Sequence, residues 1–220
     1  MDNKTLSVIY NPSLILYLPL WKRDGNTFPS DDSFGHSCSV TGATWGTLGR
    51  TFDGNDYIDC GGDAQFTFAG DMSVDAWIKT STTGAYQKLI GKMASGQFEW
   101  GFRIDDNNTA RFAIYQSDST VYSSANSSNT VTDNNWHHIA GVFDDNVSTK
   151  IYVDGIERGS STSFAGTRGG DLGADVNIGR RAGLADLYFT GTIGEIRLYN
   201  RNLTVLEIQN LYRLTKWRYQ

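Results

Sequence analysis

The residues with the clearest potential for chemistry lie in three strand-like segments, 72–79, 98–104 and 110–116, along which apolar and polar residues alternate. Alternate residues of a strand point to opposite faces, so the polar set would share one face if these strands are neighbours. Aromatic rings can stack on the apolar faces of sugars, while arginine and carboxylate groups can bind sugar hydroxyls. The pattern therefore predicts a ligand-binding face for a sugar, made by Trp77, Glu99, Arg103, Arg111 and Tyr115.

A second interpretation of the same residues is that Trp77 packs in a second layer and the charged groups are only solvated. Catalysis is a third possibility, because His137 and His138 could combine with Tyr115 and Arg103 in lyase chemistry. Neighbours in a strand point to opposite faces, however, which favours structural roles for the two histidines. Glycoside hydrolysis needs two carboxylates that flank the scissile bond, and only four scattered glutamates are present. The sequence leaves open whether the chain is an enzyme, with the preference against it.

The elements that would position these residues are short strands separated by turns. The chain has 220 residues with 24 glycines, and breaks rich in Asp, Asn, Ser and Gly recur between the apolar runs. Only one helix is expected, near the C-terminus, where Thr204 and Glu207 form a capping-box pattern. We therefore predict an all-β fold, a two-sheet antiparallel β-sandwich with one short C-terminal helix. The strand-like segments are 14–18, 51–59, 72–79, 98–104, 110–116, 121–125, 138–143, 150–154, 176–179 and 193–199.

Four stretches, in this order and at this spacing, carry a family resemblance. They are Gly-Arg-Thr-Phe-Asp-Gly-Asn-Asp-Tyr-Ile at 49–58, Met-Ser-Val-Asp-Ala-Trp-Ile at 72–78, Trp-His-His-Ile-Ala-Gly-Val-Phe-Asp at 136–144 leading into Ile-Tyr-Val-Asp-Gly at 151–155, and residues 189–203. Together they resemble the laminin-G-like, or concanavalin A-like lectin/glucanase, jelly-roll family. The resemblance implies two face-to-face sheets of six or seven strands each. It divides the chain into a polar lead-in at 1–13, one domain at 14–212 and a basic, aromatic tail at 213–220.

The resemblance also implies a structural calcium ion near a sheet edge. Asp32 lies in a turn similar to the family's Asp-Ser-Ser-Gly, and Glu195 lies where the family usually has an acidic residue. Calcium takes six to eight oxygen ligands, which carboxylates and loop carbonyls supply together. The expected side-chain ligands are Asp32 and Glu195, with Asp31 in reserve. The alternative is an ordinary turn aspartate and a Glu195 paired with Arg197 or a cross-strand base.

For function, the resemblance favours a non-catalytic recognition module that binds a carbohydrate or a cell-surface partner through a sheet face or edge loops. The sequence shows none of the motifs of the family's glucanases or alginate lyases, although a polysaccharide lyase or glycoside hydrolase on this fold stays a minor alternative. The main alternative is a structural or interaction component of an extracellular or virion surface assembly. The sequence itself leaves the location unknown, and the family resemblance implies an extracellular or virion-surface location.

The composition excludes some partners and leaves others open. A net charge of −5 argues against general nucleic-acid binding, which needs clustered Lys and Arg. No apolar run is long enough to span a bilayer, and nothing resembles a signal peptide, so membrane insertion is not expected. Cys38 and Cys60 could form one disulfide or remain two buried thiols. The tail at 213–220 could pack against the sandwich or dock onto a partner protein.

Overall fold

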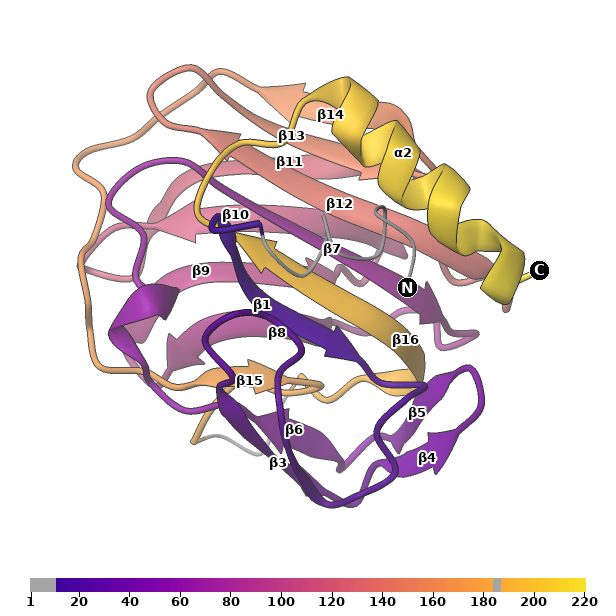
Figure 1. The fold of residues 1–220 in the computed structure, drawn as a ribbon. Coiled ribbons are helices and arrows are strands. Elements are labelled where there is room, and N and C mark those ends of the chain that lie inside the picture. The colour runs from indigo at the N-terminus through magenta and orange to yellow at the C-terminus, as the bar shows by residue number, and fades with distance from the viewer. Residues whose placement is uncertain (1–10, 184–186) are drawn as a thin grey trace.

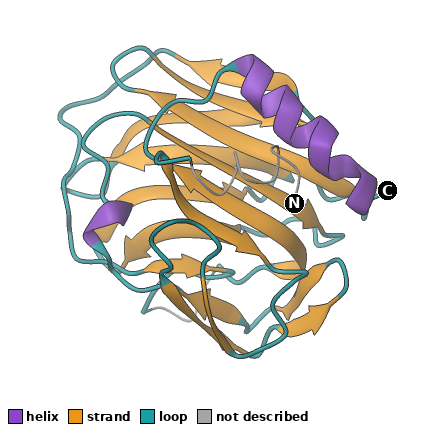
Figure 2. Cartoon of the chain, in the orientation of Figure 1, coloured by secondary structure: helices purple, strands orange, loops and turns teal. Residues whose placement is uncertain are grey.

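The computed structural model describes residues 11–183 and 187–220, and within these ranges the chain forms two face-to-face antiparallel sheets of eight strands each. Figure 1 shows the two layers, with the C-terminal helix lying across one of them, and Figure 2 shows that strands dominate both. The predicted all-β sandwich with a short C-terminal helix is confirmed. Most of the predicted lead-in, residues 1–10, lies outside the described residues.

Sheet A carries the C-terminal helix on its outer face. Its strands, in spatial order, are β14 (Ile156–Ser161), β13 (Ser148–Val153), β12 (Trp136–Asp144), β7 (Met72–Lys79), β16 (Thr190–Tyr199), β5 (Gly49–Asp53) and β4 (Thr44–Gly46), and β1 (Leu14–Pro19) also pairs with β16.

Sheet B forms the second layer. Its strands, in spatial order, are β11 (Val121–Thr130), β10 (Thr109–Tyr115), β9 (Gln97–Ile104), β8 (Gln87–Ala94), β15 (Val176–Ile178), β6 (Tyr57–Asp59), β3 (Ser37–Thr41) and β2 (Thr27–Pro29). The helical elements among the described residues are η1 (Ala64–Phe66), α2 (Val205–Thr215) and η2 (Lys216–Arg218).

The main core fills the space between the sheets, because each strand turns its alternate apolar side chains inward. Phe102 and Phe112 of sheet B and Ile139 and Leu198 of sheet A are all fully buried there. A second, smaller apolar layer lies between sheet A and α2 and includes Ile208 of the helix. Because the apolar side chains of each strand point into the core, the residues between them point to the outer face of the sheet. This alternation determines the direction of the predicted ligand-binding residues.

Two differences from the expected strands matter for the site. The segment predicted as one strand over 51–59 is divided between β5 and β6, which lie in different sheets on either side of a turn. Strand β8 was not expected at all, although it lies between β9 and β15 in sheet B. Its sequence Gln-Lys-Leu-Ile-Gly-Lys-Met-Ala places two lysines on buried positions, which breaks the alternation that marks a half-exposed strand.

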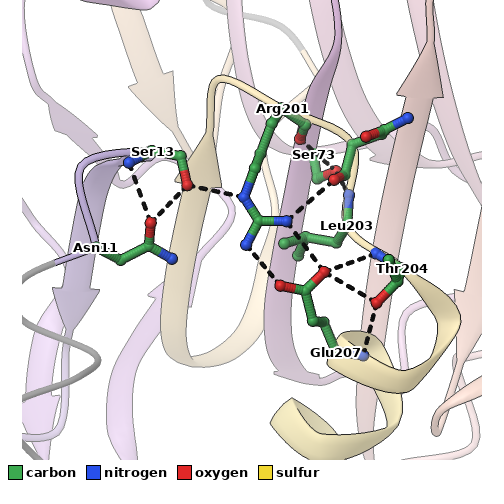
Figure 3. A network of polar contacts seen from close by, with 8 residues as sticks. Asn11, Ser13, Ser73, Arg201, Leu203, Thr204 and Glu207 are labelled. Atoms are coloured by element: carbon green, nitrogen blue, oxygen red, sulfur yellow. Dashed lines mark hydrogen bonds and ion pairs between the residues drawn. The ribbon is translucent and has the colours of Figure 1, made fainter.

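A polar network fastens the start of α2 to the sandwich (Figure 3). The Thr204 side chain accepts from the backbone N–H of Glu207, while the Glu207 carboxylate accepts from the backbone N–H of Thr204, which makes a capping box. Glu207 also pairs with Arg201 at 2.6 Å, and Arg201 donates to Ser13 at the start of β1. The Arg201 guanidinium lowers the pKa of Glu207 to about 2. The helix runs to Thr215, so the predicted division after residue 212 falls inside it.

Cys38 and Cys60 form a disulfide that joins β3 to the end of the neighbouring strand β6. The bond closes a loop between residues 22 positions apart, so its reduction should lower the free energy of unfolding by about 3 kcal/mol. Urea unfolding with and without reductant measures this loss. A Cys38→Ala/Cys60→Ala double variant serves as the control, because its unfolding should not respond to reductant. Identical curves for the wild type in both conditions would contradict the assignment.

Candidate functional site

Three basic residues form a row across neighbouring strands on the outer face of sheet B. Lys88 on β8 pairs with Arg103 on β9, which in turn pairs with Arg111 on β10, and Asn126 on β11 extends the row. We call Lys88, Arg103 and Arg111 the cation row. Like charges directly opposite one another destabilise a sheet, so this arrangement works against folding rather than for it.

The two arginines of the row are half-buried and have few partners for their charge. Arg103 Nε donates to the Asp105 carboxylate at 2.5 Å, and its guanidinium lies 4.8 Å from the centre of the Tyr86 ring. Arg111 donates from Nη2 to Ser124 Oγ at 3.2 Å. The Nε of Arg111 is buried and meets no hydrogen-bond acceptor in the described part of the chain. The row therefore keeps donor capacity that the described residues do not use.

Lys88 is the deepest member of the row, with only 1% of its surface exposed. Its ammonium lies directly above Gly101, where an added Cβ would come within 2.5 Å of Nζ. The hydrogen-bond acceptor that Nζ reaches among the described residues is the sulfur of Met93, a weak acceptor. Burial, and then the neighbouring Arg103 and Arg181, hold the pKa of Lys88 well below its usual range.

Apolar and aromatic side chains adjoin the cation row on the same face. Met93, Ala113 and Tyr115 form a small buried cluster, against which Phe98 packs. The rings of Phe98 and Tyr115 meet edge to face at 5.4 Å, and the guanidinium of Arg181 lies 5.3 Å from the centre of the Phe98 ring. Burial raises the pKa of the Tyr115 hydroxyl, which therefore stays protonated as a donor at neutral pH. The face thus combines cations, hydroxyl groups and ring edges.

Arg103, Arg111 and Tyr115 are the predicted ligand-binding residues that the structure places together, and their role in binding stays a prediction. Glu99, also predicted for this face, does not lie beside these three residues. It lies at a register shift in β9 between two pairs with β8, and its carboxylate binds Lys92 at 2.8 Å and the backbone N–H of Leu172 at 3.0 Å. The irregular pairing interrupts the alternation on which the prediction rested.

The prediction that Trp77 shares a face with the arginines is also wrong. It lies on β7, whose neighbours are β12 and β16 of sheet A, so it belongs to the other layer. The indole donates to Thr215 Oγ1 at 2.7 Å and stacks on the Tyr219 ring at 4.6 Å. Trp77 is 2% exposed and packs under the C-terminal segment, in agreement with the second interpretation of its role.

The two histidines have structural partners in sheet A. His137 lies between the carboxylates of Asp154 and Asp133, at 2.9 and 3.0 Å, and the Asp154 carboxylate raises its pKa. His138 is fully buried on the outer face of sheet A, where its Nε2 lies 3.2 Å from Asp75. The sandwich core separates His138 from Arg103, so the structure does not bring these two together for lyase chemistry. The nitrogens of His137 are both within hydrogen-bond distance of aspartates, which agrees with the structural role that strand geometry favours.

The three carboxylates predicted to bind calcium each have protein partners. Asp31 pairs with Lys22 and Arg23, and Glu195 pairs with Arg197 at 3.0 Å. Asp32 accepts from the backbone N–H groups of residues 17, 34 and 35. Within the described ranges, no group of three or more His, Cys, Asp or Glu side chains is arranged to hold a metal ion. These residues do not fit a shared calcium site, and calcium binding itself stays a prediction.

The C-terminal tail packs against sheet A through part of its side chains. Tyr219 is 4% exposed, whereas Leu206, Leu214 and Trp217 of α2 and η2 are more than 60% exposed. Packing of the tail was one of the two expected outcomes, and docking onto a partner stays a prediction. None of the described helices is long and apolar enough to cross a membrane.

Sequence reasoning missed Lys88 because it missed β8. The available signal was the pair Leu89 and Ile90, a short apolar run of the kind that a central strand contains. Lys88 and Lys92 flank that pair, and their charge argued against a buried strand. Asn126 and Asp105, which complete the polar part of the face, were missed because they lie at the edges of the predicted segments.

Comparisons with known proteins agree with this architecture. The binding domain of botulinum neurotoxin serotype D matches with a TM-score of 0.71 and 15% identity, over 92% of this chain and 52% of that chain. The binding domain of Paraclostridial Mosquitocidal Protein 1 gives 0.69 and 15%, over 91% and 52%. Trypanosoma rangeli sialidase in complex with sialic acid gives 0.69 and 16%, over 96% of this chain and 34% of that chain.

At these identities the similarity establishes the fold alone, and the chain spans about half the length of the toxin binding domains. A search of curated proteins found no match. The family model described as the concanavalin A-like lectin/glucanases superfamily matches residues 52–209, which is most of the chain. The protein therefore belongs to the concanavalin A-like lectin/glucanases superfamily.

Proposed function

We propose that this chain is a non-catalytic recognition module that binds a glycan on the outer face of sheet B. The observation that carries the proposal is the set of partly exposed polar groups that adjacent strands present there. Arg103, Arg111 and Ser124 are half-buried and Asn126 is exposed, and the rings of Tyr115 and Phe98 lie farther along the same face. Guanidinium, amide and hydroxyl groups bind sugar hydroxyls, while ring edges contact the apolar faces of sugars.

The outer face of sheet A is a poorer candidate for the glycan-binding face than the outer face of sheet B, because α2 covers it. On the outer face of sheet A, Ala140, Val142 and Tyr152 are covered by α2 and pack with Ile208 of that helix. Family membership also favours a binding role, since the similar toxin domains are named as binding domains. The Cys38–Cys60 disulfide supports an extracellular or virion-surface location, because disulfides persist in oxidising surroundings.

Affinity electrophoresis through gels that contain single polysaccharides tests the proposal. We expect the wild-type protein to be retarded by at least one polymer, without shortening of that polymer. An Arg103→Ala variant should lose about tenfold in affinity, because a hydrogen bond to a charged group contributes about 1.5–3 kcal/mol. Lys150→Ala is the matched control, since Lys150 is a partly exposed cation on β13 of sheet A.

Two results would argue against this function. Absence of retardation by any polymer in a broad panel would move the assignment to a structural or interaction component. Equal loss of affinity in Arg103→Ala and Lys150→Ala would show that overall charge, rather than the outer face of sheet B, determines the retardation. Shortening of the polymer would instead identify an enzyme.

A further inference from the structure

We propose that the cation row binds the anionic group of an acidic sugar, a carboxylate or a sulfate ester. The inference rests on the proposed glycan-binding function and names its ligand class. It predicts that Arg103 and Arg111 contact the anion, and that Lys88 lies beneath them, where a bound anion would favour its charged form.

The first argument is the local balance of charge. The chain as a whole has a net charge of −5, yet Lys88, Arg103 and Arg111 lie on consecutive strands of one sheet face. Asp105 contacts this group through Arg103. Repulsion between neighbouring cations raises the energy of the unliganded face, and a bound anion would relieve that repulsion.

The second argument compares two buried lysines on the same strand. Lys92 is 0% exposed, and its ammonium binds the carboxylates of Glu99 at 2.8 Å and Asp171 at 2.6 Å. Lys88 is 1% exposed, and the guanidinium groups near it are joined by the carboxylate of Asp105. A buried cation is costly unless a counter-charge lies close to it. Among the described residues, the ammonium of Lys92 contacts two carboxylates directly, whereas that of Lys88 reaches the sulfur of Met93 and is affected by Asp105 without an ion pair to it. An anion on the row would bring a further negative charge close to that ammonium.

The third argument is the geometry of the arginines. Guanidinium groups bind carboxylate and sulfate with two parallel hydrogen bonds, which a planar fork of donors permits. Arg111 has a buried Nε without an acceptor among the described residues, and its Nη2 binds only the neutral Ser124. Among the described residues, the other titratable groups around the row include Tyr115, Tyr86 and the carboxylates of residues 105 and 106. Among the described groups, the three basic residues of the cation row thus outnumber the two carboxylates beside it.

Isothermal titration with oligosaccharides of equal length tests the inference. The probes are a galacturonate oligomer, a hyaluronan oligomer, a sulfated dextran oligomer and, as neutral partners, dextran and cellulose oligomers. We expect binding of a carboxylated or sulfated probe at least tenfold tighter than binding of any neutral probe. Arg111→Gln should weaken that binding about tenfold or more, while the carboxylated and sulfated probes show which anion is preferred.

A matched pair of variants separates a binding role from a structural one. Lys88→Met should weaken binding of the acidic probe several-fold while the melting temperature stays the same or rises, because it removes a buried amine whose acceptor among the described residues is the weak thioether of Met93. Lys92→Met should lower the melting temperature, because it leaves Glu99 buried without its partner, and should leave the affinity unchanged. Lys88→Met would thus change affinity but not lower the melting temperature, and Lys92→Met would do the opposite. A purely structural role for Lys88 would not produce this difference.

Several outcomes overturn the inference, and they are distinguishable from failure of the proposed function. Tight binding of neutral probes alone would retain the glycan-binding function and reject the acidic ligand. Binding of acidic probes that Arg111→Gln and Lys88→Met do not weaken would place the anion elsewhere. Equal binding of polyglutamate would indicate non-specific attraction of polyanions. Absence of binding to every oligosaccharide would reject both proposals.

Discussion

Replacing Asp75 by alanine is expected to lower the free energy of unfolding by about 3–5 kcal/mol, because it breaks a fully buried ion network. Asp75 is 0% exposed, and its carboxylate accepts from Arg197 Nη1 at 2.9 Å. His138 contacts the same carboxylate, and Glu195 pairs with the other side of Arg197 at 3.0 Å. Loss of Asp75 would leave the buried guanidinium with a positive charge that Glu195 alone must balance. Urea unfolding of both proteins at neutral pH measures the difference.

The same network gives stability a definite pH dependence. Burial alone would raise the pKa of Asp75, but the charge of Arg197 and the contact with His138 hold it below its usual range. A carboxylate with a lowered pKa stabilises the fold at pH values above its unfolded pKa of about 4, and this contribution is lost as the pH falls through the folded pKa. Asp144→Ala, at a partly exposed position of β12, is the control and should change stability by no more than about 0.5 kcal/mol. A comparable loss in both variants would contradict the role of the network.

Replacing Tyr219 by alanine is expected to destabilise the protein by about 3–5 kcal/mol, although this residue is the penultimate one of the chain. Its ring lies 4.6 Å from the ring of Trp77 and 4.7 Å from that of Trp136. It also fills the space above Gly194, where an added Cβ would come within 2.4 Å of the ring. The alanine variant would leave a cavity between the tail and sheet A.

The matched control for Tyr219 is phenylalanine. The Tyr219 hydroxyl is buried and has no hydrogen-bond partner among the described residues, and burial raises its pKa. Tyr219→Phe keeps the ring and removes the unpaired hydroxyl, so it should preserve or increase stability. Chemical unfolding of the wild type and both variants provides the comparison. If the alanine variant were as stable as the wild type, the tail would not be part of the folded domain.

The fold was accessible from the sequence because its signals are local. The Tyr-Val-Asp-Gly turn between β13 and β14 and the Thr204–Glu207 capping box each identify an element within a few residues. The alternation in β9 and β10 correctly placed Arg103 and Arg111 on one face, since pairing of consecutive strands preserves the register.

The remainder of the site depends on long-range pairing. Trp77 lies in sheet A because β7 pairs with β12 and β16. The sequence around β7 contains no local pattern that identifies these two partner strands. The register shift that carries Glu99 away from Arg103 arises from pairing with β8, a strand that the alternation rule does not recognise. The position of Lys88 could not be predicted for a related reason, because its ammonium packs against Gly101 of the neighbouring strand β9.

Mapping of a bound acidic oligosaccharide by amide chemical shifts tests the central claim most directly. The account predicts that the largest changes, upon addition of the tightest-binding probe, cluster on the outer face of sheet B at Gly101, Arg103, Arg111 and Ser124. The amides of Ile208 and Tyr219, on the opposite side of the sandwich, should change little. Changes concentrated on α2 and the tail, with none along β9 and β10, would contradict the assignment of the binding face.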